Sequence, residues 1–498
     1  MNIDIKKIIL LPFILIIAAG LRIYNLTAIS LWHDEAFSGL LMRYDLGEML
    51  YRIGLDVHPP FYYLVLRIWD FVFGSSLFSL RMFSVFFSIL IILAVYLFVK
   101  QAFKNKNLAL FSSALTALNC FQIQYAQEAR MYTLGAFLII ISSYFLLKAL
   151  NKNAKSPLLW WGLYIISVSA GIYIHYYVFF SILAQGIFVL YYVFRESKFN
   201  ISLWLKNQNF QLAMFAYLAA AVSYLPWLKI FFRQLSQVQE SYWIPAMNIW
   251  SIPCTFYKLS TGAGINASEC ASILIIMMIA ITLAIIYFLK KNKMPAKWLA
   301  LSLLIVPFIA SIAMSIKTSI YLDRYFIFVS GFYIIFICAA ILEIKNKFIR
   351  NTLIIITILG SLISFGHYWN DLDIKDKPGM AKAAAHLNQE VKPNHKIYVG
   401  SSFVYFTFKY YNKTPVQPLL FAPGELLHFS GTALLSPEDI IKNFEQPQKN
   451  DIVWFINTTG FGNYQPEVPN NWIKQQEKGF QDAHPYQGWI IITQYKVQ

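Results

Sequence analysis

The chain has 498 residues, of which 58% are hydrophobic and 13% are charged, and its mean hydropathy is +0.52. A soluble domain carries about 25% charged residues, and a soluble core could not bury this much apolar surface. The composition therefore excludes a soluble globular protein and indicates that most of the chain lies in a membrane.

Long apolar runs predict about eleven membrane spans of about 16–21 residues each. The first run has no small-residue cleavage site and others follow it, so we expect an uncleaved span and not a signal peptide. The fifth and sixth runs have no polar break between them, and we place a turn at Tyr176–Tyr177. The predicted spans are 8–24, 80–99, 108–124, 132–149, 159–178, 179–194, 211–231, 271–289, 298–316, 325–343 and 351–368.

Lysine and arginine gather in alternate connections between these spans. If the N-terminus is cytoplasmic, every inner connection is basic, whereas the outer connections and the last part of the chain are close to neutral. This is the pattern of the positive-inside rule. The net charge of +16 is therefore a signal of topology, and nucleic acid is not an expected partner. An odd number of spans places the C-terminus outside.

The expected organisation is a polytopic α-helical membrane domain, residues 1–369, and an extracytoplasmic α/β domain, residues 370–498. The first outer loop, 25–79, contains an amphipathic stretch that predicts helix in the membrane interface, and the outer segment 232–270 also looks interfacial. In the second domain, KIYVGSSFVYFTF (396–408) and NDIVWFIN (450–457) predict strands, while GMAKAAAHLNQEV (379–391) and SPEDIIKNFEQ (436–446) predict helices.

Polar and ionisable residues gather at the outer ends of the spans, where such residues are costly and indicate function. The plain alternative is a set of interfacial charges and helix caps. Glu128 and Arg130, however, stand two positions apart, so on a helix they would not face and neutralise each other. The candidates come from five separate segments and are Asp34, Glu35, Asp56, His58, Glu128, Arg130, His175, Arg324 and Tyr325.

These residue types suit transfer of a group from a lipid-linked phosphate. A carboxylate can accept the proton of an acceptor hydroxyl, and arginine binds phosphate through its planar fork. Nucleotide sugars are absent outside the cytoplasm, so a lipid phosphate is the expected carrier.

The motifs resemble those of the GT-C membrane glycosyltransferases, in the bacterial branch of glycosyltransferase family 39 related to protein O-mannosyltransferases and lipid A aminoarabinose transferases. The matching stretches are WHDEA, DVHPPFYY, YAQEARMY, HYY and DRYF. The resemblance implies a polyprenyl-phosphate sugar donor, a site facing outward from the bacterial plasma (inner) membrane, and inversion at the anomeric carbon. The acceptor is a lipid, a glycan or a protein.

The resemblance also implies roles. Asp34 would be the catalytic base, with Glu35 beside it as a further catalytic or orienting acid. His58, Arg130, Arg324 and Tyr325 would bind the donor phosphate, and Asp56, Glu128 and His175 would orient the site. Val57 and His58 stand where aminoarabinose transferases carry a Glu-Lys pair, so neither specific activity of the branch is expected to transfer.

Several alternatives stay open. Asp34, Asp56 and His58 could hold a divalent metal such as magnesium or manganese through oxygen and imidazole ligands. The rival functions are a flippase or transporter of lipid-linked sugars and a ligase of a preassembled lipid-linked glycan. No inverted repeat of the kind that builds transporters is found, which favours a hexosyl- or pentosyltransferase (EC 2.4 class). Cys254 and Cys270 fall outside and could form a disulfide, although apolar packing is expected.

Overall fold

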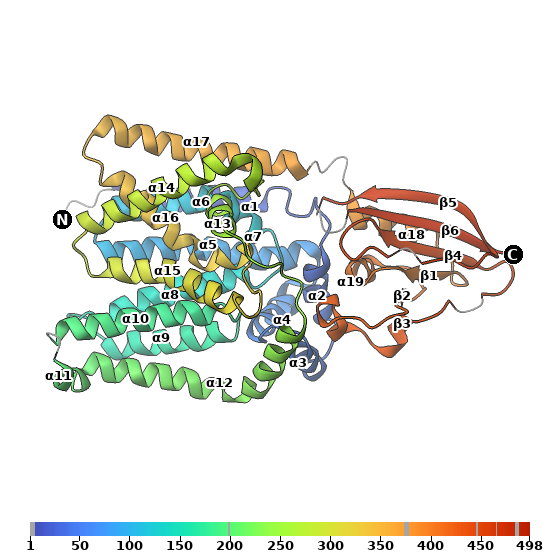
Figure 1. Cartoon of the computed structure of the whole chain (residues 1–498), viewed down its shortest axis with the longest axis horizontal. Coiled ribbons are helices and arrows are strands. Elements are labelled where there is room, and N and C mark those ends of the chain that lie inside the picture. Colours follow the sequence, from blue (N-terminus) through green and yellow to red (C-terminus); the bar gives the residue numbers. More distant parts are fainter. Residues whose placement is uncertain (1–4, 198–199, 373–377, 445–446, 465, 484–487) are drawn as a thin grey trace.

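The computed structural model describes residues 5–197, 200–372, 378–444, 447–464, 466–483 and 488–498. Helices occupy the first part of the chain, and a six-stranded sheet with two helices forms the second part, at one end of the helices (Figure 1). The helices of the first part are α1 (Ile5–Ile23), α2 (His33–Leu41), α3 (Leu46–Leu55), α4 (Phe61–Phe73), α5 (Leu77–Phe103), α6 (Lys106–Leu118), α7 (Cys120–Ala126), α8 (Tyr132–Ala149), α9 (Pro157–Ile172), α10 (Val178–Glu196), α11 (Ile201–Leu205), α12 (Gln208–Glu240), α13 (Ser251–Thr261), α14 (Ala267–Lys291), α15 (Ala296–Ser315), the 3₁₀ helix η1 (Asp323–Phe326), α16 (Ile327–Leu342) and α17 (Lys347–Leu372).

Within the described residues, eight helices are long and apolar enough to cross a membrane. Two shorter apolar helices, Leu10–Ile23 and Pro157–Ile172, coincide with predicted spans. The predicted span 108–124 is divided between α6 and α7 at Asn119, so the count of eleven spans stays a prediction. The turn that we placed at Tyr176–Tyr177 is confirmed, because α9 ends at Ile172 and α10 begins at Val178.

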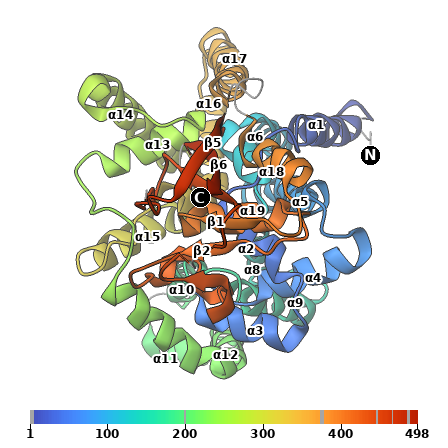
Figure 2. The same cartoon turned by 90° about the vertical axis from the view of Figure 1, so that its right-hand side faces the viewer.

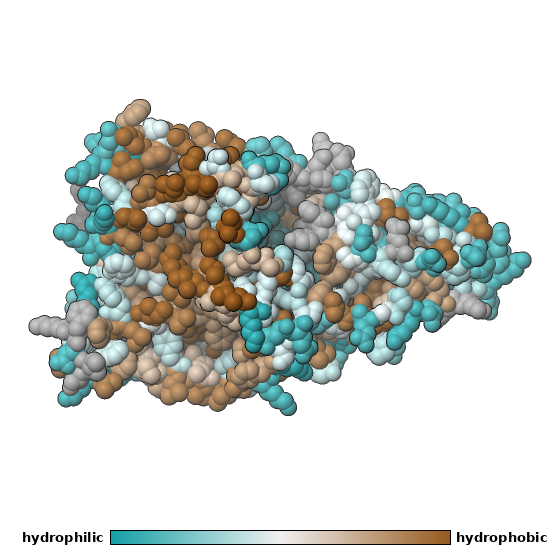
Figure 3. All heavy atoms as spheres, viewed as in Figure 1, coloured by the Kyte–Doolittle hydropathy of each residue, from teal (hydrophilic) through white to brown (hydrophobic). Residues whose placement is uncertain are grey.

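On the face seen in Figure 3, a broad apolar band covers the helical part, with hydrophilic residues at both of its ends. Burial differs sharply between the helices beneath it. The apolar window of Asp323–Leu342 is 89% buried, whereas that of Lys347–Asn370 is 6% buried. A helix that is apolar all round belongs inside a bundle or against lipid. We therefore assign α16 to the centre of the bundle and α17 to its lipid-facing edge.

Arg22 joins three helices inside this bundle. Its guanidinium donates to Ser88 Oγ on α5 (2.7 Å) and to the backbone oxygens of Thr116 (3.2 Å) and Ala117 (2.9 Å) near the C-terminal end of α6. The last carbonyls of a helix have no partner within the helix. Arg22 therefore supplies the donors that let α6 end within the bundle, before Asn119 starts α7 by accepting from the Gln122 N–H.

The segment 25–79 forms three short helices, α2, α3 and α4. The amphipathic stretch predicted as helix is divided between α2 and α3, and its place in the membrane interface stays a prediction. Asp45 caps α3 by accepting from the Glu48 N–H (3.0 Å). The C-terminal end of α3 is held by α12, where Gln234 donates to the backbone oxygens of Ile53 (3.1 Å) and Gly54 (3.3 Å). These contacts fix the chain just before Asp56.

The second part contains α18 (Gly379–Glu390), α19 (Ser402–Tyr411) and a sheet of order β3-β2-β1-β4-β6-β5. The strands β3, β2, β1 and β4 pair in parallel, and β4, β6 and β5 pair antiparallel. The helix α19 packs on both β1 and α2, so it lies between the sheet and the helical part (Figure 1). The strands are β1 (Lys396–Val399), β2 (Leu419–Phe421), β3 (Ile440–Ile441), β4 (Ile452–Thr458), β5 (Trp472–Gln481) and β6 (Trp489–Val497).

Two predictions for this part are confirmed and two are wrong. The helix at 379–391 and the strand at 450–457 are present as α18 and β4. The stretch 396–408 is a strand only to Val399 and then becomes α19, because Ser401 accepts from the Phe403 N–H and starts a helix.

The helix predicted at 436–446 is instead a single 3₁₀ turn followed by β3, and residues 445–446 lie outside the described residues. The expected capping box of Ser436 and Asp439 is present. Asp439, however, is also bonded to Tyr405 (2.8 Å) and Lys409 (2.7 Å) on α19, so these contacts hold the segment against α19 and not in a longer helix.

All four cysteines are free in the described chain, so Cys254 and Cys270 are not joined.

Candidate active site

A cavity of about 480 Å³ lies where one end of the helical part meets the second part of the chain. The view in Figure 2 shows the sheet and α19 in front of the helices. The cavity has charged residues on the helical side and aromatic residues from both parts. Its lining residues are Trp32, His33, Asp34, Phe37, Asp56, Val57, His58, Arg130, Tyr132, Tyr242, Trp243, Pro245, Leu322, Arg324, Tyr325, Phe403, Phe429, Gly431 and Phe461.

Asp34 lies in the first turn of α2 and leaves 30% of its side chain exposed. Its Oδ2 is 3.6 Å from an Arg324 nitrogen and 3.9 Å from an Arg130 nitrogen. Burial acts to raise the pKa of Asp34, but the two guanidinium groups outweigh it and hold that pKa below its ordinary value. The carboxylate is therefore ionised at neutral pH and faces the cavity.

Glu35 is fully buried and does not line the cavity. Its two oxygens accept from Arg81 on α5 at 2.8 and 2.7 Å, in the planar two-point geometry that suits arginine and carboxylate. It also accepts from the Ala129 N–H (2.8 Å) in the α7–α8 connection. Glu35 thus ties α2 to two other segments and fixes the direction of the neighbouring Asp34.

Asp56, His58 and Arg130 form a chain of contacts along one side of the cavity. Asp56 Oδ2 lies 2.8 Å from His58 Nδ1, and His58 Nε2 lies 3.5 Å from an Arg130 nitrogen. Arg130 also donates to the Asp34 backbone oxygen (3.1 Å), while its Nε has no hydrogen-bond partner among the described residues. A buried arginine N–H without a partner is costly unless a ligand supplies the acceptor.

Arg324, in η1, lies over two aromatic rings. Its guanidinium carbon is 5.0 Å from the centre of the Trp32 ring and 5.7 Å from that of Trp243. Tyr325 follows it, and the Tyr325 hydroxyl is 3.4 Å from that of Tyr242. The two tryptophans hold the guanidinium plane through cation–π contact, so this charge is placed beside Asp34 by packing as well as by attraction.

Glu128 and His175 lie near the cavity without lining it. Burial raises the pKa of Glu128 to about 7, and its Oε2 has no partner among the described residues. His175 accepts from the Tyr177 N–H (3.2 Å) through Nδ1, and its ring centre is 5.8 Å from that of His58. The structure thus brings Asp34, Asp56, His58, Arg130, Arg324 and Tyr325 to one cavity, and Glu35, Glu128 and His175 to its surroundings.

A second cavity of about 260 Å³ lies beside the first. The two cavities share Val57, His58, Tyr242 and Tyr325. The rest of the second cavity is mostly apolar and lies between α10, α12 and the end of α15, with lining residues that include Phe179, Phe180, Phe231, Leu235, Val238 and Met314. The two cavities are therefore neighbours, the first lined by charged residues and the second mostly by apolar ones.

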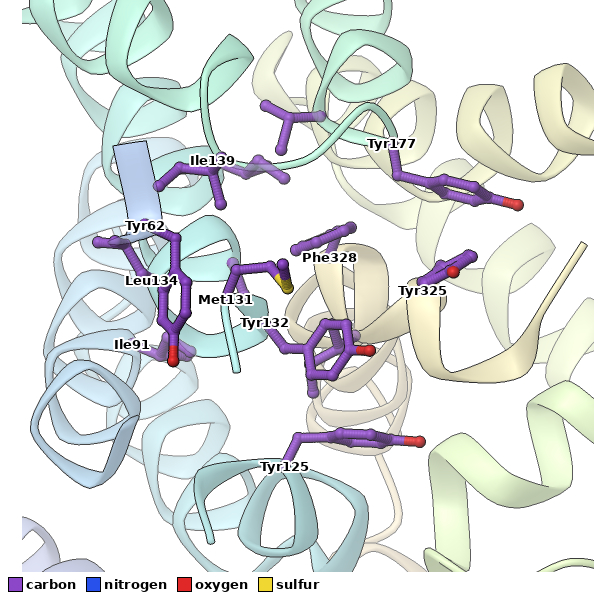
Figure 4. Packing of buried hydrophobic residues seen from close by; sticks show 14 of the residues in the cluster. Tyr62, Ile91, Tyr125, Met131, Tyr132, Leu134, Ile139, Tyr177, Tyr325 and Phe328 are labelled. Atoms are coloured by element: carbon purple, nitrogen blue, oxygen red, sulfur yellow. The ribbon is translucent and has the colours of Figure 1, made fainter. Parts of the chain in front are cut away.

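The packing beside the cavity changes from aliphatic to tyrosine-rich. In Figure 4 the hydroxyls of Tyr125, Tyr132 and Tyr177 point the same way, away from the aliphatic side chains of Ile91 and Leu134. Tyr132 lines the first cavity and Tyr177 the second. This part of the core thus presents tyrosines where it borders the two cavities.

Several cavity residues are absent from the predicted set. His33 is adjacent to Asp34 and is 9% exposed, and its place inside WHDEA was a signal that could have been used. Trp243, Phe403, Phe429 and Phe461 carry no such signal, because aromatic residues are frequent throughout the chain.

The described residues contain no group of three or more His, Cys, Asp and Glu side chains that could hold a metal ion. Asp56 and His58 bind each other, and Asp34 faces two guanidinium groups. These residues therefore do not fit the metal site that we left open, and no chemistry is derived through a metal.

A family model described as dolichyl-phosphate-mannose-protein mannosyltransferase matches residues 57–227, which is less than half of the chain. This segment contains His58, Arg130 and His175. No curated protein matches the chain at a significant level.

Two crystal structures of ArnT from Cupriavidus metallidurans, one apo and one bound to undecaprenyl phosphate, are similar to the chain with a TM-score of 0.60 and 13% identity, over 97% of both chains. The archaeal oligosaccharyltransferase AglB from Archaeoglobus fulgidus, in complex with an inhibitory peptide and a dolichol-phosphate, has a TM-score of 0.51 and 13% identity, over 82% of this chain and 64% of its own. At this identity the likeness concerns the fold, and it confirms the fold that the motifs indicated.

Proposed function

We propose, from the premise that the chain has the GT-C fold of membrane glycosyltransferases, that it is an inverting glycosyltransferase. It moves a single sugar from a polyprenyl-phosphate-linked donor to an acceptor at the outer face of the bacterial plasma membrane. The observation that carries this proposal is the pair of neighbouring cavities, of which one is lined by two arginines and the other, between helices, is mostly apolar. That pairing suits a lipid phosphate, which joins a charged group to an apolar chain.

Arg130 and Arg324 would bind the phosphate, with His58 beside them. The unpartnered Arg130 Nε supports this, because a phosphate oxygen would supply the acceptor that the described residues lack. The first isoprene units would follow the apolar cavity between α10 and α12.

Asp34 would act as the base. Its carboxylate takes the proton of an acceptor hydroxyl, and the acceptor oxygen forms a bond to the anomeric carbon from the face opposite the phosphate. The bond between the anomeric carbon and the phosphate oxygen breaks, and the electron pair leaves with polyprenyl phosphate. The arginines stabilise the growing charge on that oxygen, which is where preorganised cations contribute most. Glu35 and Asp56 would act as positioning residues, through Arg81 and His58.

The test is sugar transfer by the purified full chain in lipid nanodiscs, with undecaprenyl-phosphate-linked glucose, mannose, galactose and arabinose as donors. The change is Asp34→Asn, which keeps the shape of the side chain and removes the base. We expect the rate of transfer to fall at least about 10³-fold, the upper part of the range for a lost general base. The matched control is Asp45→Asn, which keeps a capping residue on α3 outside the cavity.

Equal rates for the wild type and Asp34→Asn would show that Asp34 is not the base. Absence of both transfer and undecaprenyl-phosphate binding in the wild type would refute the proposed enzyme. Movement of lipid-linked sugar across the bilayer of proteoliposomes would support the flippase in its place.

A further inference from the structure

The second part of the chain supplies one wall of the first cavity. Phe403 comes from α19, Phe461 follows β4, and Phe429 and Gly431 lie between β2 and β3. Among the described residues this wall carries no charge, whereas the helical side carries Asp34, Asp56, His58, Arg130 and Arg324. One side of the cavity therefore carries charges together with aromatic rings, and the other, here called the aromatic side, carries no charge, which suits two different ligand groups.

The aromatic side is partly open. Phe461 leaves 46% of its side chain exposed, and its ring centre lies 4.8 Å from that of Phe403 at an interplanar angle of 77°. Exposed large aromatic rings that face a cavity offer apolar surface to a ligand, and such rings are typical anchors of recognition sites. The two rings form a corner and not a continuous packed layer.

His33 joins this corner to Asp34. Its ring centre is 5.0 Å from that of Phe403 and 5.4 Å from that of Phe406. The side chain is 9% exposed and lines the cavity, and its Nδ1 has no hydrogen-bond partner among the described residues. A buried ring nitrogen without a partner is costly, so a ligand hydroxyl at this place would be favourable.

Direct contacts hold the aromatic wall in a fixed position beside α2. The Tyr411 hydroxyl accepts from the Leu31 N–H (3.0 Å), and Arg43 donates to the Tyr410 backbone oxygen (3.1 Å). A methyl group added at Gly39 would lie 2.8 Å from the Tyr410 ring, which shows how closely α19 approaches α2. The position of Phe403 relative to Asp34 is therefore fixed by direct packing.

We infer that the corner formed by Phe403, Phe461 and His33 binds a sugar ring of the acceptor, and that the acceptor is an uncharged carbohydrate. The inference rests on the proposed function. In an inverting displacement the acceptor approaches from the side opposite the phosphate, and the base faces it. Arg130 and His58 lie on the phosphate side, so the aromatic side remains for the acceptor.

A sugar ring fits this corner for chemical reasons. Its C–H faces are apolar and pack on aromatic rings, while its hydroxyls bind polar atoms such as His33 Nδ1. The described aromatic wall offers neither a cation for a phosphorylated acceptor nor an anion for a basic one. An uncharged glycan needs neither.

The experiment is saturation-transfer difference NMR on the full chain in nanodiscs with saturating undecaprenyl phosphate. The probes are uncharged oligosaccharides (maltotriose, mannotriose, chitotriose and a rhamnose trisaccharide), with a Ser/Thr-rich peptide as the rival acceptor. We expect transfer to the ring C–H protons of at least one oligosaccharide. Phe403→Ala and Phe461→Ala should each raise the Kd of that glycan about tenfold, the size of one lost aromatic contact. Phe403→Trp, which keeps a large aromatic ring, should bind that glycan about as well as the wild type does.

Two controls separate this inference from the proposed function. Phe480→Ala removes a phenylalanine from β5, away from the cavity, and should leave glycan binding unchanged. Undecaprenyl-phosphate affinity, measured by native mass spectrometry, should change less than about twofold in Phe403→Ala, because no phosphate contact is lost. Retained lipid binding with no glycan binding, or with binding of the peptide alone, would overturn the inference and leave the proposed function standing. Equal glycan Kd values for the wild type and Phe403→Ala would overturn it as well.

Discussion

Two buried arginines near the cavity, Arg81 and Arg130, illustrate how similar residues take different roles. Arg81 binds both oxygens of Glu35 and the backbone oxygens of Leu26 and Ile29, so its N–H groups are used to join segments. Arg130 makes fewer bonds and keeps an Nε without a described partner beside the cavity. The first is typical of a structural ion pair. The second is typical of a residue whose remaining N–H group binds a ligand.

The buried carboxyl group of Glu128 leads to a prediction about how stability depends on pH. Burial raises its pKa from the ordinary 4.5 to about 7, so the neutral form is favoured in the folded protein. Because the folded protein holds this proton more tightly than the unfolded chain does, neutral Glu128 stabilises the fold. This stabilisation is fully present below pH 4.5 and is lost as the pH rises through about 7. Glu128→Gln, which mimics the neutral form, should therefore raise the melting temperature at pH 8 by about 2–4 °C and should change it less at pH 5.

The measurement is thermal unfolding of the purified chain at both pH values. Glu425→Gln, at an exposed position in the second part, is the control and should show no such pH dependence. A gain at pH 5 as large as that at pH 8 would contradict the raised pKa.

At the scale of elements, helix ends within the bundle are stabilised by long-range donors. Arg22 gives such donors to the end of α6, and Gln234 gives them to the end of α3. A buried carbonyl that loses its donor costs about 1–3 kcal/mol. These contacts therefore fix where each helix stops and where the next segment begins.

Arg22→Met keeps the apolar stem and removes the donors. We expect a loss of about 2–3 kcal/mol in the free energy of unfolding, because the oxygens of Thr116 and Ala117 and the Ser88 hydroxyl lose their partner. Unfolding in mixed detergent with rising SDS provides the measurement. Lys100→Met, at an exposed position in the last turn of α5, is the control, and an equal effect of both changes would show that the loss of a charge is responsible and not the loss of the bonds.

The contact of α2 with α19 can be tested by a pair of changes. Gly39→Ala places a methyl group 2.8 Å from the Tyr410 ring, so α19 must move or α2 must shift. Transfer activity should fall about tenfold or more, because a small displacement of Asp34 misaligns the base. Tyr410→Ala removes the obstacle, and the double variant should recover most of the activity. A double variant that is as slow as Gly39→Ala would contradict steric displacement.

The sequence predicts some residues of the site and misses others, and there is a physical reason in each case. Asp34, His58, Arg130 and Arg324 stand out because ionisable residues at the ends of apolar runs are rare. Arg81 lies at the start of the predicted span 80–99 but outside the five recognised motifs, so it was not selected, although it is the partner of Glu35. Phe403 is hidden too, because SSFVYFTF has the aromatic and β-branched composition of a strand, while Ser401 caps it as a helix and tertiary packing keeps it there.

For the whole molecule, the basic connections between alternate spans predict which end of the molecule faces the cytoplasm. The cavity, the short helices of the first outer loop and the second part of the chain lie together at one end of the helices (Figure 1). A substrate that arrives on a lipid in the outer leaflet would reach this end. The placement of a polar site at one end, and not midway along the helices, agrees with an enzyme better than with a transporter.

Fusions to reporter proteins test this direction. Alkaline phosphatase joined after Gln498 should be active, because it folds only outside the cytoplasm, and green fluorescent protein at the same place should be dark. Fusions at Lys345, between α16 and α17, should give the opposite result and serve as the internal control. The reverse pattern would place the cavity on the cytoplasmic side and remove the rationale for a lipid-linked donor.

The bond between the Leu31 N–H and the Tyr411 hydroxyl joins positions separated by 380 residues. During synthesis the segment with Asp34 leaves the ribosome early, whereas α19 leaves only after every predicted span. The neighbourhood of Asp34 is therefore completed only after all the predicted spans have been synthesised. A chain interrupted before that point would contain the base and the arginines without their aromatic wall. The order of synthesis therefore makes the proposed acceptor wall the later part of the site to form.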